Sequence, residues 1–266
     1  MSALFFDIDN TLLSHRTFTV PKSAETALWE AKRNGHFLFL ASGRNISGMK
    51  EYYDPDLFDG MVSSSGGLGM FHGEVIYSHP MDLADTERII YLAREYGTGL
   101  FMQAKDSNWM NPPGYARMLR YLKNDEEALN KRGIQMIQEY RGEPVLKMDL
   151  FFTESSRADR ILDVLPEGVE KCVTLSEIPE QAGCEVTRKG ITKGTGVREM
   201  MEYLGKDIRD SYGFGDSEND LAMLKECGTG IAMGNAMELV RREADYVTAD
   251  IEEDGIYQAM KHFGLF

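Results

Sequence analysis

Short apolar runs and amphipathic stretches alternate along the first 60 residues. Residues 4–6 and 36–41 are apolar runs, which predicts two strands buried on both faces of a sheet. Between them, residues 23–34 carry alanine and leucine on one helical face, so we expect a helix with Ser23 as its N-cap. A third short strand is expected at residues 58–63. This alternation of strand and helix favours a parallel sheet with right-handed crossovers.

The pattern changes after residue 65. Residues 68–71 and 74–77 flank the pair His72-Gly73, which predicts a β-hairpin. Residues 79–82 then have the composition of a linker that leads out of the first domain.

Beyond this linker, helices and strands follow one another without strict alternation. Asp82 is expected to cap a helix with Ile89, Ile90 and Ala93 on its apolar face. Strands are expected at residues 99–104, 144–152, 169–175 and 183–187, and one or two helices at residues 115–131. Such a mixture predicts an α+β module with one sheet and helices on one face.

The alternation of helix and strand returns from Thr192 onward. Helices are expected at 192–204, 217–227, 236–244 and 253–263, and strands at 211–214, 229–233 and 246–248. The middle of the chain is therefore predicted to be an insertion. Residues 1–81 and 189–266 would form an α/β core, and residues 82–188 an inserted α+β domain.

Composition narrows the classes of partner. The 266 residues carry a formal net charge of -14, which argues against nucleic acid or an anionic membrane as a partner. An anionic small molecule would need a metal ion, a lysine or helix N-termini to bind. Three cysteines without CxxC spacing suit a reducing cytoplasm. We see no signal peptide at the start and no apolar run of about 18 residues that would span a membrane.

Polar residues that can carry chemistry follow the predicted strands or begin the predicted helices of the core. Ligands of open α/β sheets bind beyond the carboxyl ends of the strands, where the strand order reverses. Four sets of such residues stand out: Asp7 and Asp9; Ser42 with Gly43 and Arg44; Lys193; and Asp216 with Asn219 and Asp220.

A divalent cation would explain the concentration of carboxylates. If the strand that begins at Leu4 lies beside the one that begins at Ser211, then Asp7 and Asp216 meet at the same sheet edge. Neighbouring carboxylates repel one another unless a cation or a proton lies between them. Magnesium fits best, because it accepts few carboxylates and keeps waters and a phosphate oxygen.

Each of these residues also has a structural alternative. Asp216 and Asp220 could cap the helix that they open, and Ser42 could only form a turn. Arg44 could hold a phosphate or pair with a nearby acid. Lys193 is unusual at a helix start, because the positive end of the helix dipole disfavours a cation, and this favours a functional role.

The four sets, in this order, resemble the motifs of the haloacid dehalogenase superfamily, in the Cof-type phosphatase branch. In that branch the cap domain is inserted between the third core strand and the lysine motif, and the resemblance covers nearly the whole chain. It implies a Rossmann-like, doubly wound parallel sheet of strand order 3-2-1-4-5-6 with an α+β cap. The motifs are Asp7-Ile8-Asp9-Asn10-Thr11, Ala41-Ser42-Gly43-Arg44, Lys189-Gly190-Ile191-Thr192-Lys193-Gly194 and Gly215-Asp216-Ser217-Glu218-Asn219-Asp220.

The resemblance also implies a role for each motif residue. Asp7 would be the nucleophile that forms an aspartyl-phosphate, and Asp9 would be the general acid and then the base. Magnesium would be held by Asp7, the backbone carbonyl of Asp9 and Asp216, with Asp220 beside it.

Other motif residues would contact the phosphate. Ser42, the Gly43 amide and Lys193 would bind the phosphoryl oxygens. Asn219, and Arg44 if it is not paired with an acid, would join the phosphate or substrate shell.

The resemblance is weaker around the substrate. The branch often has Asn-Gly-Ala after the third strand, whereas this chain has Ser65-Gly66-Gly67. In the expected cap, Trp109 and Asn111 of the loop 105–115 could contact a sugar or a ring. Alternatively, this loop is kinked by its prolines and packs Trp109 within its own domain.

We therefore expect a cytoplasmic, Mg²⁺-dependent phosphatase that hydrolyses a small phosphomonoester, a sugar phosphate or a phosphorylated cofactor. A phosphotransferase or phosphomutase of the same fold, or a non-catalytic phospholigand-binding protein, are the alternatives. The expected partner is a small phosphorylated metabolite, and the expected state is a monomer or a weak homodimer.

Overall fold

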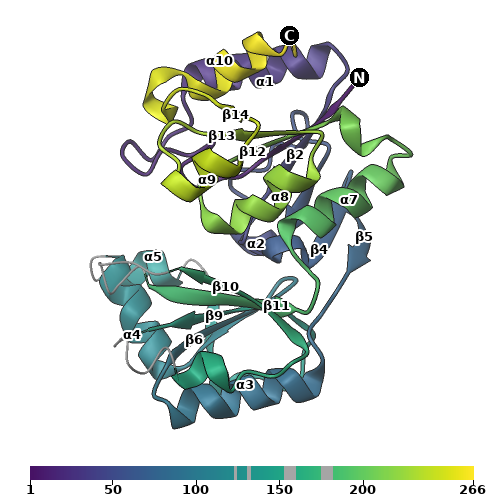
Figure 1. The fold of residues 1–266 in the computed structure, drawn as a ribbon. Helices are drawn as coiled ribbons and strands as arrows, with labels where there is room; N and C mark the ends of the chain where they lie inside the picture. The colour runs from purple at the N-terminus through teal and green to yellow at the C-terminus, as the bar shows by residue number, and fades with distance from the viewer. Residues whose placement is uncertain (123–124, 131–132, 153–159, 175–181) are drawn as a thin grey trace. The chain divides into compact units, whose positions relative to one another are not determined.

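The structure, a computed structural model, describes residues 1–122, 125–130, 133–152, 160–174 and 182–266. The chain divides into two compact units (Figure 1). The core unit comprises Met1–Arg44, Met49–Ser78 and Thr192–Phe266, and the inserted unit comprises Asn45–Gly48 and His79–Ile191. The inserted unit thus includes a four-residue segment that directly follows Arg44.

The core unit contains one sheet in the order β14-β13-β12-β1-β2-β3-β4-β5. The pairings from β14 to β3 are all parallel, and they confirm the predicted order 3-2-1-4-5-6. The hairpin β4-β5 extends the sheet with antiparallel pairing. The strands are β1 (Ala3–Phe6), β2 (Phe37–Ala41), β3 (Gly60–Ser63), β4 (Leu68–Phe71), β5 (Glu74–Ser78), β12 (Ser211–Gly215), β13 (Thr229–Ala232) and β14 (Tyr246–Val247).

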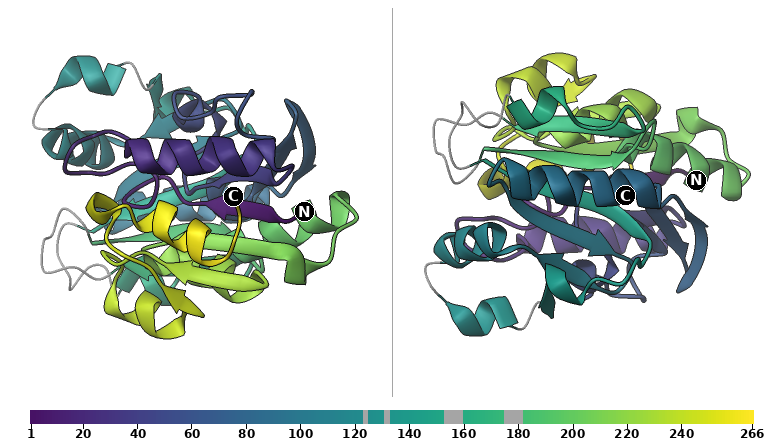
Figure 2. Two further views of the ribbon diagram at one scale, coloured as in Figure 1. Left: turned by 90° about the horizontal axis from the view of Figure 1, so that it is seen from above. Right: turned by 90° about the horizontal axis from the view of Figure 1, so that it is seen from below.

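Helices cover both faces of this sheet (Figure 1), and α1 and α10 lie side by side along one of them (Figure 2, left). The helices of the core unit are α1 (Lys22–Arg33), α7 (Lys193–Tyr203), α8 (Leu221–Glu226), α9 (Glu238–Glu243) and α10 (Gly255–His262), and short 3₁₀ turns occupy Ser64–Gly66, Ile208–Asp210, Glu218–Asp220 and Ile251–Glu253. The short helix α2 (Ile46–Met49) begins in the segment Asn45–Gly48 of the inserted unit and ends at Met49 of the core unit.

Apolar strand residues form the centre of the core unit. All four residues of β1 are buried, as expected for a strand with neighbours on both sides and helices on both faces. Phe5 stacks on Phe39 with ring centroids 4.9 Å apart, and Phe6 stacks on Phe214 at 4.6 Å. Burial of one such ring contributes roughly 2–3 kcal/mol. The rings therefore fix the strand ends that carry Asp7 and Asp216.

The inserted unit has a six-stranded sheet in the order β10-β11-β9-β6-β7-β8, antiparallel except for the pair β7-β8. Helix α3 packs through Ile89, Leu92 and Ala93 in the apolar core of this unit. Of the predicted apolar face, Ile89 and Ala93 are thus confirmed, whereas Ile90 is only partly buried. The elements are α3 (Leu83–Glu95), β6 (Gly99–Ala104), β7 (Asn108–Met110), α4 (Pro112–Tyr121), α5 (Glu126–Asn130), β8 (Ile134–Met136), a 3₁₀ turn (Ile137–Glu139), β9 (Val145–Phe151), β10 (Val169–Thr174) and β11 (Gly183–Arg188).

Some boundaries differ from those expected. The N-cap of α1 is Pro21, and Ser23 instead donates its hydroxyl proton to Asp254, so the predicted cap is wrong. The expected helix at 217–227 begins as a 3₁₀ turn, and α8 starts only at Leu221. Strands β7 and β8 were not expected. Among the described residues, no helix has both the length and the apolar character needed to cross a membrane.

Candidate active site

The central strand β1 delivers Asp7 to the carboxyl edge of the sheet. The backbone N–H of Asp7 donates to the carbonyl oxygen of Phe214 at 3.0 Å, which continues the ladder with β12 by one residue. Because Phe6 pairs in parallel with Phe214, Asp7 and Asp216 emerge at the same edge. The structure thus brings together the two residues whose meeting the sequence analysis made conditional on neighbouring strands.

A tight turn follows Asp7. Asn10 has a left-handed backbone with φ of 56°, and the N–H groups of Leu12 and Leu13 both donate to the carbonyl of Ile8. This turn directs the Thr11 hydroxyl back to the cluster, where it donates to Asp216 Oδ1 at 3.3 Å. Asn235 supports the turn, because its side-chain amide donates to the carbonyl of Asn10 at 2.8 Å.

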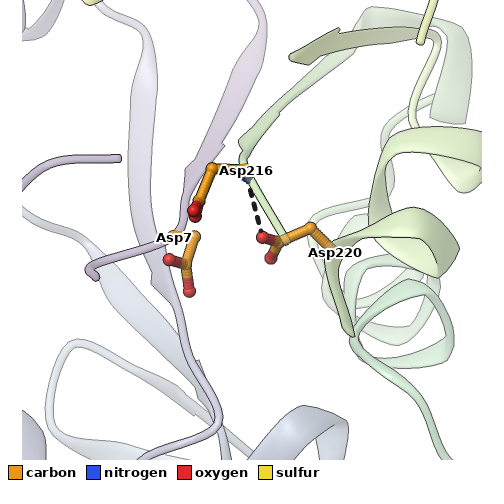
Figure 3. Close-up of side chains that lie close together, drawn as sticks. All are labelled: Asp7, Asp216 and Asp220. Atoms are coloured by element: carbon orange, nitrogen blue, oxygen red, sulfur yellow. Dashed lines mark hydrogen bonds between the residues drawn. The ribbon is translucent and has the colours of Figure 1, made fainter. Parts of the chain in front are cut away.

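Three buried carboxylates converge at this edge (Figure 3). One oxygen each of Asp7, Asp216 and Asp220 lies within 4.8 Å of the others, and all three residues are buried. Asp220 is oriented by the backbone N–H groups of Asp216 and Ser217, which donate to its Oδ2 at 3.0 and 3.1 Å. Close carboxylate oxygens in a buried site are the donor set of a hard divalent cation. The cluster therefore fits a metal ion.

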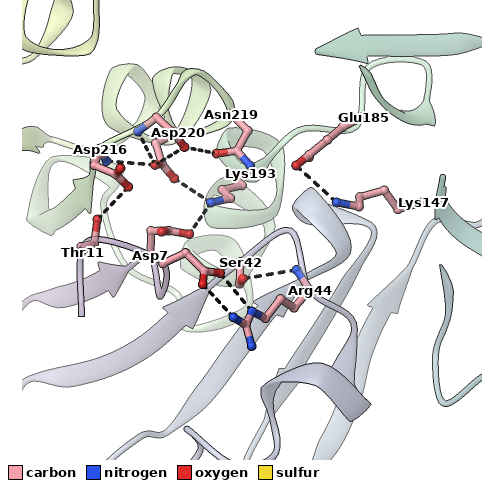
Figure 4. Close-up of polar contacts among 12 residues, drawn as sticks. Asp7, Thr11, Ser42, Arg44, Lys147, Glu185, Lys193, Asp216, Asn219 and Asp220 are labelled. Atoms are coloured by element: carbon pink, nitrogen blue, oxygen red, sulfur yellow. Dashed lines mark hydrogen bonds and ion pairs between the residues drawn. The ribbon is translucent and has the colours of Figure 1, made fainter. Parts of the chain in front are cut away.

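Lys193 is the cation of this cluster. It is the first residue of α7 and is 1% exposed, and its Nζ lies 2.6 Å from Asp7 Oδ1 and 2.6 Å from Asp220 Oδ1 (Figure 4). A Cβ on Gly194 would lie 2.3 Å from the carbonyl oxygen of Ala222, so only glycine lets α7 approach α8 this closely. The lysine at a helix start, which the sequence analysis found unusual, is thus explained by two carboxylate partners.

The charges in the cluster do not balance. Burial raises the pKa of Asp7 well above its ordinary value even though Lys193 is adjacent. Burial, followed by the charge of Asp220, raises the pKa of Asp216 to about 7. The pKa of Lys193 is also raised, because the charges of Asp220 and Asp7 outweigh the effect of its burial. The cluster contains one lysine and three carboxylates, and this excess of negative groups favours the binding of a further cation.

The side chain of Asp9 turns to other partners. Arg44 donates from Nη2 to Asp9 Oδ1 at 2.7 Å and from Nε to Asp9 Oδ2 at 3.0 Å, and His15 Nε2 lies 2.8 Å from Oδ1. Burial alone would raise the pKa of Asp9, but hydrogen bonds from His15 and Arg44 hold it well below its ordinary value. Of the two alternatives for Arg44, the structure shows the one in which it pairs with an acid.

Ser42 and Arg44 lie in the loop that follows β2. The Arg44 N–H donates to the hydroxyl of Ser42 at 3.2 Å, and Ser42 is 1% exposed. The carbonyls of Ser42 and Arg44 accept hydrogen bonds from the backbone N–H groups of Ser65 and Ser64 at 3.0 and 2.8 Å. Both of these serines have a positive φ, so a left-handed turn after β3 supports this loop. Gly43 lies in the same loop, next to Ser42.

The remaining motif residue, Asn219, accepts a hydrogen bond from the Ser217 hydroxyl at 2.8 Å (Figure 4). Its expected contact with phosphate or substrate stays a prediction. His15 and the turn at residues 64–65 were missed by the sequence analysis. A histidine six positions after Asp9 has no motif signal, and the turn is recognisable only from its backbone angles.

The expected substrate contacts in the inserted unit have structural roles instead. Trp109 is 1% exposed and packs in the hydrophobic core of that unit, edge-on to Tyr140. Asn111 is the N-cap of α4: its Oδ1 accepts from Gly114, and its amide donates to the carbonyl of Thr98. Both side chains are used within their own unit, so the interpretation of Trp109 and Asn111 as substrate contacts is wrong.

An acidic residue near the C-terminus begins the last helix, and the three cysteines form no disulfide bond. Asp254 is the N-cap residue of α10 and accepts the Ser23 hydroxyl. The cysteines Cys172, Cys184 and Cys227 are free thiols, of which the last two are buried.

Comparison with known proteins identifies the family. A family model described as haloacid dehalogenase-like hydrolase matches residues 4–260. YkrA of Bacillus subtilis (strain 168), named as a phosphatase, is 30% identical over 265 residues, which cover 98% of this chain and 97% of YkrA. A B. subtilis (strain 168) phosphatase of 5-amino-6-(5-phospho-D-ribitylamino)uracil, YcsE, is 35% identical over 120 residues, 45% of this chain and 47% of YcsE.

The solved structures agree with this result. The structure of a sugar phosphatase of haloacid dehalogenase subclass IIB matches with a TM-score of 0.84 and 30% identity and covers 100% of both chains. In this similarity, the parallel core sheet corresponds to the Rossmann-like fold of the family and the inserted unit to its cap. The chain belongs to the haloacid dehalogenase-like hydrolases, in the branch of the phosphatases that it resembles.

Proposed function

We propose that this protein is a Mg²⁺-dependent phosphatase that hydrolyses a small phosphomonoester through an aspartyl-phosphate on Asp7. The convergence of Asp7, Asp216 and Asp220 on one another, with Lys193 between two of them, is the observation that carries the proposal. An anionic nucleophile that approaches a phosphate dianion is repelled by it. A site that gathers a buried lysine and the ligands of a divalent cation around the nucleophile reduces this repulsion.

The donor set fits magnesium. Three carboxylates offer oxygen ligands, which Mg²⁺ prefers. Burial, together with the charge of Asp220, raises the pKa values of Asp7 and Asp216, so a further cation would stabilise their charged forms. Asp7, Asp216 and the backbone carbonyl of Asp9 would hold the ion, with Asp220 beside it. The bound ion would supply positive charge to the transferring phosphoryl group.

Protein residues would carry the reaction in two steps. A carboxylate oxygen of Asp7 bonds to phosphorus while the bond from phosphorus to the leaving oxygen breaks. Asp9, which takes up a proton once its hydrogen bonds from Arg44 are released, gives that proton to the leaving oxygen. A water molecule then loses a proton to Asp9 and attacks the aspartyl-phosphate, which releases inorganic phosphate and restores Asp7. The Ser42 hydroxyl, the Gly43 amide and Lys193 would stabilise the phosphoryl oxygens.

A sugar phosphate is the favoured substrate class. Its support is the similarity to a sugar phosphatase over the whole chain at 30% identity. A phosphorylated cofactor or one of its precursors is the second candidate class, because the similarity to YcsE, though shorter, reaches 35% identity. In this proposal the inserted unit acts as the cap that shields the reaction from water.

A panel of phosphomonoesters tests the proposal. We expect purified protein with Mg²⁺ to release inorganic phosphate from several sugar phosphates and from 4-nitrophenyl phosphate, and to lose this activity when a chelator removes the ion. Pyridoxal phosphate and flavin mononucleotide represent the second substrate class. Formation of an isomerised sugar phosphate without free phosphate would instead show a phosphomutase. Release from none of these compounds would contradict phosphatase function.

A further inference from the structure

The two carboxylate oxygens of Asp9 have different hydrogen-bond partners. Its Oδ1 is shared, because Arg44 Nη2 lies 2.7 Å and His15 Nε2 lies 2.8 Å from it. Among the described residues, its Oδ2 accepts a hydrogen bond only from Arg44 Nε, at 3.0 Å. The two oxygens are therefore not equivalent: one is held from two sides and the other from one side.

The loop that carries His15 is built to reach Asp9. The turn at Asn10 folds the chain back, and a bridge pairs Asp9 with Leu13. A second turn follows, in which the Ser14 N–H donates to the carbonyl of Thr19 at 3.1 Å. His15 begins this second turn, so its ring returns to a residue six positions earlier in the chain.

The second turn is also anchored at its base. The Ser14 hydroxyl accepts hydrogen bonds from the backbone N–H groups of Arg16 and Thr17, at 3.1 and 3.2 Å, and donates to Glu252. The Arg16 side chain, 79% exposed, lies 3.7 Å from the same glutamate and adds little to this anchoring. The backbone at His15 is thus held by the hydrogen bonds of the residues on either side of it.

Arg44 has a second possible partner besides Asp9. Arg44 lies in the same loop as Ser42 and Gly43, which bind the phosphoryl oxygens in the proposed function. An arginine at this place can bind an anionic group of the substrate instead of Asp9. If Arg44 turned to a substrate anion, Asp9 would lose both hydrogen bonds that Arg44 donates. His15 would remain on Oδ1, and Oδ2 would be open to proton exchange.

We propose that His15 is a positioning residue for Asp9: it holds Oδ1 so that Oδ2 faces the leaving oxygen, and later the water, once Arg44 has engaged the substrate. This inference rests on the proposed phosphatase function. The opposing interpretation is a surface pair with no bearing on the reaction, since the side chains of His15 and Asp9 are 38% and 34% exposed and such pairs contribute little to stability.

A series of leaving groups separates the two interpretations. Aryl phosphates with acidic leaving phenols, such as 2,4-dinitrophenyl phosphate, need little help from a general acid, whereas phenyl phosphate needs it. The value of kcat/KM reports the first transfer to Asp7. We therefore compare kcat/KM across the series for the unmodified protein, His15→Ala and His15→Gln. Glutamine retains an N–H donor close to the position of Nε2. Arg16→Ala, in the same turn, is the matched control.

We expect His15→Ala to lower kcat/KM for phenyl phosphate roughly ten-fold and to leave that for 2,4-dinitrophenyl phosphate within two-fold. His15→Gln should restore most of the loss, and Arg16→Ala should keep the unmodified dependence on the leaving group. An equal loss across the series, no loss at all, or the same loss in Arg16→Ala would overturn the role of His15. If the unmodified protein hydrolyses no compound of the series, it is the phosphatase function itself that fails.

Discussion

Two buried groups of charges, one in each unit, place a lysine between two carboxylates. In the core unit Lys193 lies 2.6 Å from both Asp7 and Asp220. In the inserted unit Lys147, which is 4% exposed, lies 2.9 Å from Asp149 and 3.3 Å from Glu185 (Figure 4). The residue types are the same, but the surroundings differ.

The difference lies in which groups stabilise the remaining negative charge. In the inserted unit the amide of Gln103 donates to Asp149 Oδ2 at 2.7 Å, and the four residues sit on adjacent strands β6, β9 and β11. In the part of the core unit that the structure describes, the side chain of a third carboxylate, Asp216, accepts a hydrogen bond only from the neutral hydroxyl of Thr11. Protein groups complete the cluster of the inserted unit. In our proposal a metal ion completes the cluster of the core unit. A comparison of the number of protein donors with the number of carboxylates thus distinguishes a structural ion network from a candidate metal site.

The largest expected difference concerns activity. Asp7→Asn keeps the shape of the side chain but removes the nucleophile, so turnover of 4-nitrophenyl phosphate should fall by roughly 10³-fold or more. Asp149→Asn makes the same chemical change in the other cluster and should keep turnover within a few-fold. Circular dichroism would establish that both variants are folded. An active Asp7→Asn protein would remove the nucleophile assignment.

Replacement of each lysine tests how much it contributes to the free energy of unfolding. Lys193→Met and Lys147→Met each leave buried carboxylates without their cation, at a cost of about 3–5 kcal/mol in the free energy of unfolding. The measurement is denaturant unfolding without divalent ions. Addition of Mg²⁺ should recover part of the loss in Lys193→Met, because the ion replaces the missing positive charge. Equal recovery in Lys147→Met would contradict the distinction between the clusters.

An effect of intermediate size is expected for the pH dependence of Mg²⁺ binding, because of the raised pKa of Asp216. Because burial and Asp220 raise this pKa from its ordinary value of 3.8 to about 7, the metal-free carboxyl binds a proton in neutral solution. Its contribution to stability is present below about pH 4 and is lost as pH rises through about 7. Mg²⁺ displaces this proton, so affinity should increase about ten-fold from pH 6 to pH 8, measured by calorimetry. Asp149→Asn should show the same increase, and a flat profile in the unmodified protein would count against the assignment.

The smallest expected effect comes from the neutral donors. Thr11→Val removes the hydrogen bond that lowers the pKa of Asp216, and Mg²⁺ affinity at neutral pH should weaken about three-fold. Gln103→Leu removes the corresponding donor in the inserted unit and should leave the affinity unchanged. The same calorimetric titration measures both variants. A loss in Gln103→Leu as large as that in Thr11→Val would show that the clusters are coupled.

Much of the core could be predicted because its signals are local. Apolar runs flanked by turn residues located the parallel strands, and the rule for strand ends correctly gathered Asp7, Asp216 and Lys193. In the inserted unit, β7 and β8 have three residues each, too short for a periodicity. Pro112, which suggested a kinked loop, instead opens α4, where a missing N–H costs nothing.

Pairings between side chains could not be predicted in the same way. Lys147 and Asp149 alternate visibly within one expected strand, but their partner Glu185 depends on which strands become neighbours. Likewise, the contact between His15 and Asp9 requires the left-handed turn at Asn10, which the sequence permits but does not enforce. Tertiary pairing decides these contacts, and one sequence carries no record of it.

The central position of β1 has a consequence for synthesis. A ribosome releases β1 early and β12 late, because the inserted unit lies between them in the chain; Thr11 and its partner Asp216 are 205 positions apart. Until β12 is synthesised, the nascent chain holds the apolar strand β1, which leads to Asp7, with one edge unpaired, a state in which strands associate with foreign chains. The candidate active site is thus among the last parts of the protein to form, and a chain that ends before β12 lacks both Asp216 and Asp220.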